Sequence, residues 1–495
     1  AICRDLVGVR VTHLATERAV AAAHVRRLAK DGPVRTLVVA NPADGRPGFG
    51  GMSDLAPYVA LGRKAALVLT GPTGKDAEEA VRAAVRRREL RQADALVFVA
   101  GLKAVPMKER PNPVPGDKDK VIEMEPCTPA PGEPFTFATG RLFHDDLHVV
   151  ALQLARQRLL AGSRGPRKAL VASNAGGSLP LLETFSRSTV QELRNAGYET
   201  RALVGKDVTE DDLRRLLPEH DVFLWEGHHN TLIKDWKFPE WTEPLPPALI
   251  FLQSCLALMD WKALPALERG AVGVVGSSTR TYSASGGACS LAFFNALLYE
   301  DASLGDALRQ SKNFLTAYAQ LKEKRLGKGA KRGGANLRAA WAFTLWGDPT
   351  LKLPRPEQPD GAVPPVEHEV RGNTIVVSLP GDRLDKVRSA KYQAQVPANG
   401  RLAGLVRKTG EKDVNPLVPL VFTEVRLPKA PPGRTPKLRT RLPESNWVFL
   451  WDARRRTGYL LATPRARDTG ELRFRVEWQP VETVGAPRPA DGGGE

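Results

Sequence analysis

The sequence predicts an α/β fold, a mainly parallel sheet flanked by helices, followed by an all-β domain at the C-terminal end. The first observation is that short apolar runs alternate with helical patterns from residue 35 to about residue 350. The second is a change of pattern after the proline-rich residues 354–365, where short strands separated by Gly, Pro and Asn turns indicate a β-sandwich. A chain of 495 residues is also too long for one core, so several domains are expected.

Residues 1–135 are expected to form an N-terminal α/β subdomain. Apolar runs at residues 35–40, 65–70 and 95–100 indicate strands, and the Arg-rich residues 76–90 indicate an amphipathic helix. The turn Gly71-Pro72-Thr73-Gly74-Lys75 is similar to part of a phosphate loop, but no Ser or Thr follows the Lys. A plain strand-to-helix turn accounts for it.

Residues 105–134 are rich in Pro and in charges of both signs. This composition predicts a long surface excursion, and Cys127 inside it is expected to have no chemical role.

Residues 136–354 continue the alternation and are expected to form a second, larger α/β unit. Strands are predicted at residues 168–173, 200–204, 221–225, 248–254, 271–277 and 341–346. Helices are predicted at residues 147–160, 186–196, 210–217, 257–269, 287–299 and 304–324. A basic, Gly-rich loop is expected at residues 322–334, where a trypsin-like cut would also fall.

The C-terminal part is divided by composition. Residues 355–366 are predicted to be a linker, and residues 367–485 a sandwich-like domain with strands at residues 374–379, 447–451, 458–462 and 471–478. Residues 486–495 are predicted to be a disordered tail.

The composition narrows the class of protein. Hydrophobic residues make up 42% of the chain, yet no apolar run approaches the length needed to span a bilayer. The net charge of +17 raises the question of nucleic acid, but the basic residues are spread along the chain and are not interleaved with aromatics. We therefore expect no nucleic-acid partner and no membrane span. Since the first residue is Ala1, a removed leader stays open.

Two predicted strands end in reactive side chains. The first runs through Trp225 into Glu226-Gly227-His228-His229, and the second runs through Ser254 into Cys255. Ligands collect beyond the carboxyl ends of parallel strands, so the imidazole and the thiol would face one cleft. An imidazole beside a thiol can accept its proton and activate it as a nucleophile.

Plainer interpretations of these residues stay open. A cysteine after an apolar run is more often a small buried residue, and Cys289, which opens a helix, is expected to be one. His228 and His229 alone would more often be exposed polar residues or a metal pair. Zinc is disfavoured because adjacent histidines point apart, so no metal site is predicted. The four cysteines also lack the spacing of a metal site and are too few for a disulfide framework.

Six segments together resemble the gingipain family of cysteine peptidases, which have a caspase-like fold. In chain order they are Gly140-Arg141-Leu142, Trp225-Glu226-Gly227-His228, Leu252-Gln253-Ser254-Cys255, the strand at residues 270–278, Ser303-Leu304-Gly305-Asp306-Ala307-Leu308, and Leu345-Trp346-Gly347-Asp348-Pro349-Thr350. They cover residues 136–354, which the resemblance makes the catalytic domain. It implies a cysteine endopeptidase that acts on a peptide or protein substrate, without a cofactor, in an extracytoplasmic or secreted setting. Structural calcium is not predicted.

The resemblance also implies roles for individual residues. Cys255 would be the nucleophile and His228 the acid/base, with Gly227, His229 and Ser254 near the oxyanion. A specificity pocket would include Glu183, Ser277 and Ser278, although a solvated Glu at a helix edge is the commoner situation for Glu183.

This chain departs from the family pattern beside the histidine. His229 stands where the family has Gly, so a required positive φ would strain the motif or make His229 the base. Ser173-Asn174 stands where gingipains carry an acidic residue that orients the histidine. The alternative is therefore an inactive or CHAT-like caspase-fold scaffold, and a nucleic-acid-associated factor is the third class.

Overall fold

The structure is a computed structural model of the chain. It describes residues 28, 30, 32–44, 51–162, 167–259, 263–327, 331–356, 367–379, 401–405, 418–427, 429–464, 468 and 470–480. The predicted tail at residues 486–495 and most of the predicted linker lie outside this part of the chain. None of the helices in the described residues combines the length and apolarity needed to cross a membrane.

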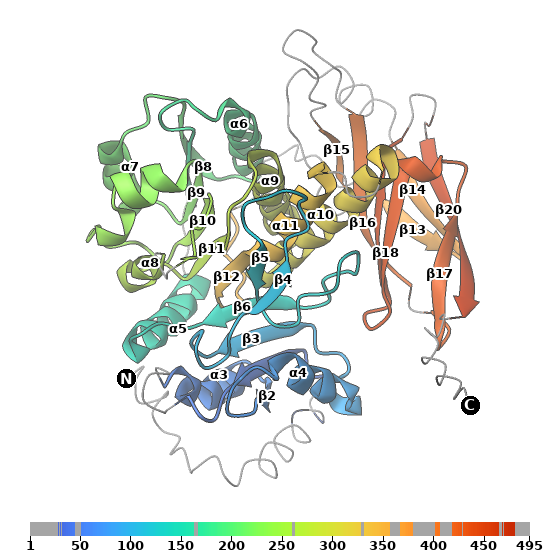
Figure 1. Cartoon of the computed structure of the whole chain (residues 1–495), viewed down its shortest axis with the longest axis horizontal. Coiled ribbons are helices and arrows are strands. Elements are labelled where there is room, and N and C mark those ends of the chain that lie inside the picture. Colours follow the sequence, from blue (N-terminus) through green and yellow to red (C-terminus); the bar gives the residue numbers. More distant parts are fainter. Residues whose placement is uncertain are drawn as a thin grey trace, which may run out of the picture.

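One ten-stranded sheet forms the centre of the α/β region (Figure 1). Its strand order is β2-β1-β3-β6-β12-β11-β10-β9-β7-β8, and neighbours are parallel except for the antiparallel pair β11–β12. The strands are β1 (Thr36–Ala40), β2 (Ala66–Leu69), β3 (Ala95–Val99), β6 (Ala138–Leu142), β7 (Lys168–Ser173), β8 (Glu199–Val204), β9 (Val222–Glu226), β10 (Leu249–Gln253), β11 (Gly273–Ser277) and β12 (Phe343–Gly347). Strands of the N-terminal and larger α/β regions thus share one sheet.

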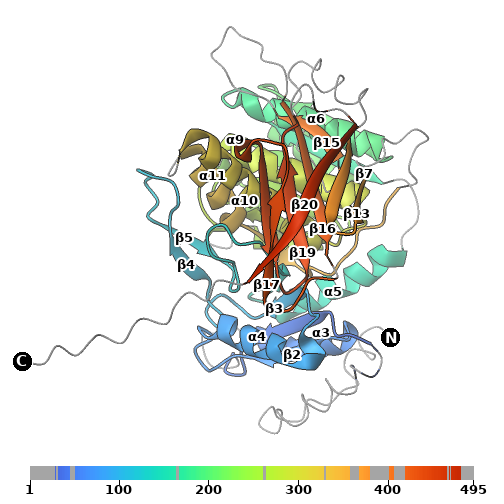
Figure 2. The ribbon, with the colours of Figure 1, turned by 90° about the vertical axis from the view of Figure 1, so that its right-hand side faces the viewer.

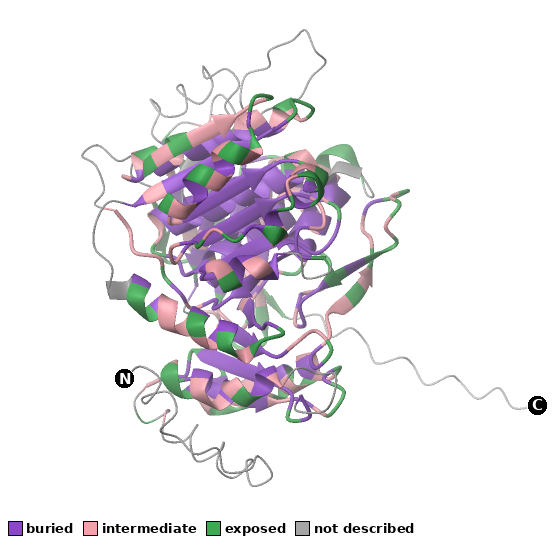
Figure 3. Cartoon of the chain, turned by 90° about the vertical axis from the view of Figure 1, so that its left-hand side faces the viewer, coloured by how far each residue is buried: buried purple, intermediate pink, exposed green. Residues whose placement is uncertain are grey.

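Helices cover both faces of this sheet, and Figure 3 shows its central strands buried between them, whereas the edge strand β8 is partly exposed. The core on one face includes α6 (Pro180–Asn195), α9 (Ser283–Tyr299), α10 (Leu304–Leu326) and α11 (Lys331–Ala342). The core on the other includes α3 (Ala56–Gly62), α5 (Leu147–Gly162), α7 (Glu210–Leu216) and α8 (Leu264–Arg269). Helix α4 (Ala77–Arg86) packs in a third cluster with β1, β2 and β3. Burial on both faces explains why the central strands read as continuous apolar runs.

Helix α9 approaches the sheet closely because its first turns consist of small residues. A side chain at Gly286 would place its Cβ 2.2 Å from Nε2 of Gln253, and one at Gly287 would place it 2.5 Å from the Phe185 ring. The helix therefore rests directly on the end of β10 and on α6. This contact sets the position of α9 below the carboxyl ends of β9 and β10.

The C-terminal region is a pair of four-stranded antiparallel sheets, as the sequence predicts. One has the order β13-β14-β20-β17 and the other β15-β16-β19-β18, with apolar side chains from both sheets in one cluster. The strands are β13 (His368–Arg371), β14 (Thr374–Leu379), β15 (Arg401–Leu405), β16 (Val418–Arg426), β17 (Arg434–Arg439), β18 (Trp447–Asp452), β19 (Thr457–Ala462) and β20 (Gly470–Pro480).

Helix α10 joins this sandwich to the α/β region, and Figure 2 shows the β-strands in front of it. The rings of Phe314 and Phe422 are 5.7 Å apart, and the buried Arg309 contacts Tyr459 and Glu424. The fold class predicted from the sequence is confirmed.

Three local predictions differ from the structure. Residues 105–134 contain the antiparallel hairpin β4 (Lys108–Pro111) and β5 (Val121–Met124) instead of forming only an irregular excursion. Most of the loop expected at residues 322–334 is helical, since α10 continues to Leu326 and α11 begins at Lys331. The helix expected at residues 257–269 is limited to α8, because residues 255–258 form a turn.

Candidate active site

Strands β9 and β10 place the expected histidine and cysteine at one level of the sheet. The last registered pair is Glu226 with Gln253, and Gly227 N–H donates to Gln253 O at 3.2 Å. His228 and Cys255 each follow two residues beyond that pair. Neighbouring strands lie about 4.8 Å apart, so the parallel register places both residues just beyond the same end of two adjacent strands.

Cys255 is half-buried and lies at the start of a sharp turn. Leu256, directly after it, has a φ of 56°, a left-handed conformation that is uncommon for a leucine. The turn is held by Leu256 N–H donating to Thr279 O at 3.0 Å, and Thr281 N–H donates to the Cys255 Sγ at 3.3 Å. The Cys255 Sγ in turn donates to Thr281 O at 3.5 Å, so both of its hydrogen bonds run to the backbone of Thr281.

His228 is exposed, and its ring is oriented by the loop that follows β7. Its Nε2 and the Ser178 Oγ are 2.9 Å apart. Asn174 shapes this loop: its φ is 55°, its N–H donates to Glu226 O at 3.0 Å, and its Oδ1 accepts from Leu179 N–H at 2.5 Å. A serine hydroxyl from the loop after β7 therefore contacts the ring, in the loop where the gingipain pattern has an acidic residue.

His229 adopts a helical backbone, with φ at −57° and ψ at −45°, and begins the turn of residues 230–235. The position needs no positive φ, so replacing the family glycine by histidine causes no backbone strain here. The side chain of His229 is 7% exposed, whereas His228 is exposed. The two adjacent rings thus occupy different surroundings, which favours His228 for contact with a substrate.

Glu226 is a buried carboxyl group directly before the Gly-His segment. It is 0% exposed, and it accepts hydrogen bonds of 2.5 Å from Ser186 on α6 and Ser290 on α9. Burial raises the pKa of Glu226 to about 7, against the opposing effect of the two serine hydrogen bonds. The carboxyl group thus ties the end of the histidine strand to two helices.

The row of the sheet that contains Glu226 is polar on the three adjacent strands β7, β9 and β10. Ser173 pairs with Glu226 in the register, and Glu226 pairs with Gln253. The Ser173 Oγ, Gln253 Oε1 and Ser254 Oγ atoms are buried and have no hydrogen-bond partner among the described residues. Sequence reasoning assigned no role to Glu226, Ser173 or Ser178, since their proximity depends on the pairing of β7 with β9.

The residues expected at the specificity pocket have internal partners. Glu183 accepts from Asn174 Nδ2 at 2.6 Å and lies 3.5 Å from Arg187. The Ser277 hydroxyl donates to Thr279 O at 2.8 Å, and that of Ser278 donates to Glu123 O at 2.6 Å. Ser277 and Ser278 thus anchor the segment after β11, and Glu183 fixes the loop after β7.

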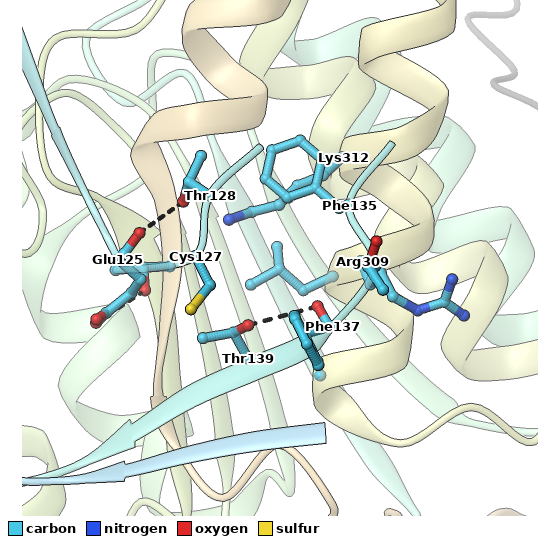
Figure 4. Close-up of a pocket in the computed structure, with 12 residues that line it drawn as sticks. Glu125, Cys127, Thr128, Phe135, Phe137, Thr139, Arg309 and Lys312 are labelled. Carbon is cyan, nitrogen blue, oxygen red and sulfur yellow. Dashed lines mark hydrogen bonds between the residues drawn. The ribbon is translucent and has the colours of Figure 1, made fainter. Parts of the chain in front are cut away.

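The other two described cysteines lie elsewhere in the fold, Cys289 buried and Cys127 partly buried. Cys289 is 0% exposed and lies 3.1 Å from the Ser311 Oγ, and burial raises its pKa to about 12. Cys127 lines an enclosed pocket between the β5–β6 connection and α10, together with Phe135 and Lys312 (Figure 4). Burial raises the pKa of Cys127 to about 12 as well, so both groups are protonated thiols at neutral pH.

Comparison with known proteins gives one family match. Residues 257–354 match the model of peptidase family C25, which confirms the resemblance to gingipain-like peptidases. The match begins two residues after Cys255 and therefore lies outside the segment that carries His228. No curated protein matches the chain.

Two solved structures show distant similarity. The complex of Porphyromonas gingivalis RgpB pro- and mature domains aligns with 70% of this chain and 86% of its own, at 14% identity and a TM-score of 0.46. A Saccharomyces cerevisiae separase–securin complex aligns with 43% of this chain and 14% of its own, at 13% identity and a TM-score of 0.31.

Proposed function

We propose that this chain, which carries a region of peptidase family C25 at residues 257–354, is a cysteine endopeptidase with Cys255 as nucleophile and His228 as acid/base. The observation that carries the proposal is the common level of the two residues, each two positions beyond the Glu226–Gln253 pair of adjacent parallel strands. The contrast among the cysteines supports it, because Cys255 is half-buried at a sheet edge while Cys289 is enclosed in the core.

The proposed reaction follows from the hydrogen bonds of the two residues. The Cys255 sulfur attacks the carbonyl carbon of the scissile bond, and backbone N–H groups around Cys255 and after His228 stabilise the oxyanion. With Nε2 beside Ser178, the Nδ1 atom of His228 remains to carry the transferred proton. His228 delivers that proton to the leaving amine, and water then hydrolyses the thioester, which restores the thiol and releases the acid.

One observation favours the second candidate, a caspase-fold scaffold without peptidase activity. The hydrogen bonds of the Cys255 sulfur run to the Thr281 backbone, and that of the His228 ring runs to Ser178, so the two groups are held separately. Catalysis requires that substrate binding brings the Cys255 thiol and the His228 ring close enough for proton transfer, whereas a scaffold has no such requirement.

Labelling with an electrophilic peptide separates the two candidates. The wild type, Cys255→Ala, His228→Ala and Cys289→Ala would be treated with a peptidyl acyloxymethyl ketone library and measured by intact mass. A peptidase takes up one label, loses it in Cys255→Ala, and retains it in the matched control Cys289→Ala. Labelling of Cys255 at the rate of a free peptide thiol, with no peptide turnover, would instead support the scaffold.

A further inference from the structure

A cleft of about 770 Å³ opens beside the residue that follows the proposed nucleophile. Its lining includes Leu256 and Met259, which come shortly after the proposed nucleophile in the chain, and Val121 and Glu123 of the β4–β5 hairpin. We call this space the hairpin cleft. Because Leu256 is bonded directly to Cys255, a peptide at the thiol would have a neighbouring side chain within reach of the cleft.

Seven of the thirteen residues that line the hairpin cleft are apolar. Two of these, Trp346 and Leu258, are buried, at 0% and 3% exposed. Val121 and Met259 are 45% and 39% exposed, and they belong to the small set of large apolar side chains that the described residues leave open to solvent. Apolar groups gathered in a concave site are typical of ligand binding.

The rim of the cleft is acidic although the chain as a whole carries +17. Glu109 and Glu123 are exposed there, Lys120 is the basic residue of the described lining, and Asp119 is paired with Arg338. Carboxylates at the rim favour a basic or neutral peptide and oppose an acidic one.

The hairpin wall is firmly attached. Arg338, 1% exposed on α11, pairs with Asp117 at 2.8 Å and with Asp119, and Tyr282 OH donates to Asp117. Although burial opposes it, hydrogen bonds from Tyr282 and Arg338 lower the pKa of Asp117 to about 2. These contacts hold the hairpin against residues 279–282, the segment that also contacts the Cys255 sulfur.

We propose that the hairpin cleft is a substrate subsite for a large apolar side chain next to the scissile bond, in a peptide with basic or neutral flanking residues. The inference rests on the proposed peptidase function and specifies its substrate class. Glu183 does not line this cleft and instead contacts Asn174 and Arg187, so the cleft predicts apolar instead of basic selectivity at the position it binds.

Turnover of a positional peptide library by the wild type, Val121→Lys and Met259→Lys tests the subsite. The wild type should prefer Leu, Met or Phe at one position beside the cut. Each variant should lose about 10-fold or more in kcat/KM for those peptides, because burial of a large apolar side chain contributes at least that factor. Leu159→Lys, which changes an exposed apolar residue outside the cleft, is the matched control and should retain wild-type selectivity.

Peptide binding to Cys255→Ala keeps this inference distinct from the proposed function. Fluorescence anisotropy with the same peptides measures the selectivity of binding in a protein that cannot cleave them. If the wild type shows no turnover, the proposed peptidase function is overturned. If peptides with apolar side chains still bind selectively, and Val121→Lys abolishes this selectivity, the subsite is supported. Equal binding or turnover of apolar and polar peptides, or selectivity unchanged in both variants, would overturn the subsite even in an active enzyme.

Discussion

Replacing Glu226 by Gln should change how stability depends on pH. The carboxyl group is buried, and its pKa rises from 4.5 to about 7 in the folded protein. Between these values the folded state holds a proton that the unfolded state has lost, so the stabilisation is complete below pH 4.5 and disappears as pH rises through 7. At about 1.4 kcal/mol per pKa unit, the wild type should lose about 3 kcal/mol across this window. Glu226→Gln is nearly isosteric and does not titrate, so it should lose none of this amount.

Amide hydrogen exchange of peptides that contain β9 gives the unfolding free energy of this region at each pH. The unfolding free energy of Glu226→Gln minus that of the wild type should increase by about 3 kcal/mol between pH 4.5 and 8. Glu79→Gln, which removes an exposed carboxylate from α4, controls for the loss of a charge and should show no comparable trend. A difference that stays constant across the range would refute the assignment of a buried, proton-binding Glu226.

Three further substitutions test contacts around the site. Ser178→Ala should lower kcat about 10-fold and shift the pH–rate profile with KM nearly unchanged, and Ser178→Thr should restore both, because the hydroxyl lies 2.9 Å from the His228 ring. Gly287→Ala should reduce stability by about 1–3 kcal/mol in chemical unfolding, since its Cβ would lie 2.5 Å from Phe185, whereas Gly62→Ala tests a site with open space around it and no positive φ. Arg338→Met should lower the free energy of unfolding by about 3–5 kcal/mol, because it leaves Asp117 and Asp119 without their buried partner. It should also reduce the protection of residues 279–282 from amide hydrogen exchange. Protection equal to that of the wild type would contradict the attachment of the hairpin.

The strands, and the positions of His228 and Cys255 at the ends of two of them, could be predicted from the sequence for a physical reason. Strands buried on both faces are continuous apolar runs, and a polar residue directly after such a run must lie at the strand end. His228 and Cys255 follow β9 and β10 in this way. The partners Ser178 and Thr281 come from other connections, so only the three-dimensional pairing of strands shows them.

The errors have physical reasons too. The hairpin at residues 108–124 has few apolar residues of its own, and it is stabilised by contacts with α11 and the segment after β11 that local patterns do not reveal. At residues 322–334, Gly333 and Gly334 lower helix propensity, but Gly334 lies where a Cβ would come 2.4 Å from Pro113 O. Close packing with the Pro-rich segment thus explains glycines that favour a loop when the sequence is considered alone.

The shared sheet limits how this protein can be shortened. Strand β6 pairs with β3 through five registered residue pairs, from Ala95–Ala138 to Val99–Leu142, but with β12 through Trp346–Arg141 alone. A chain cut before residue 136 would keep β6 and expose the edge that β3 normally covers, and such unpaired edges promote aggregation. Recombinant expression of residues 136–354 by themselves should therefore give insoluble material, while the N-terminal strands act in effect as an intramolecular cover for the rest of the sheet.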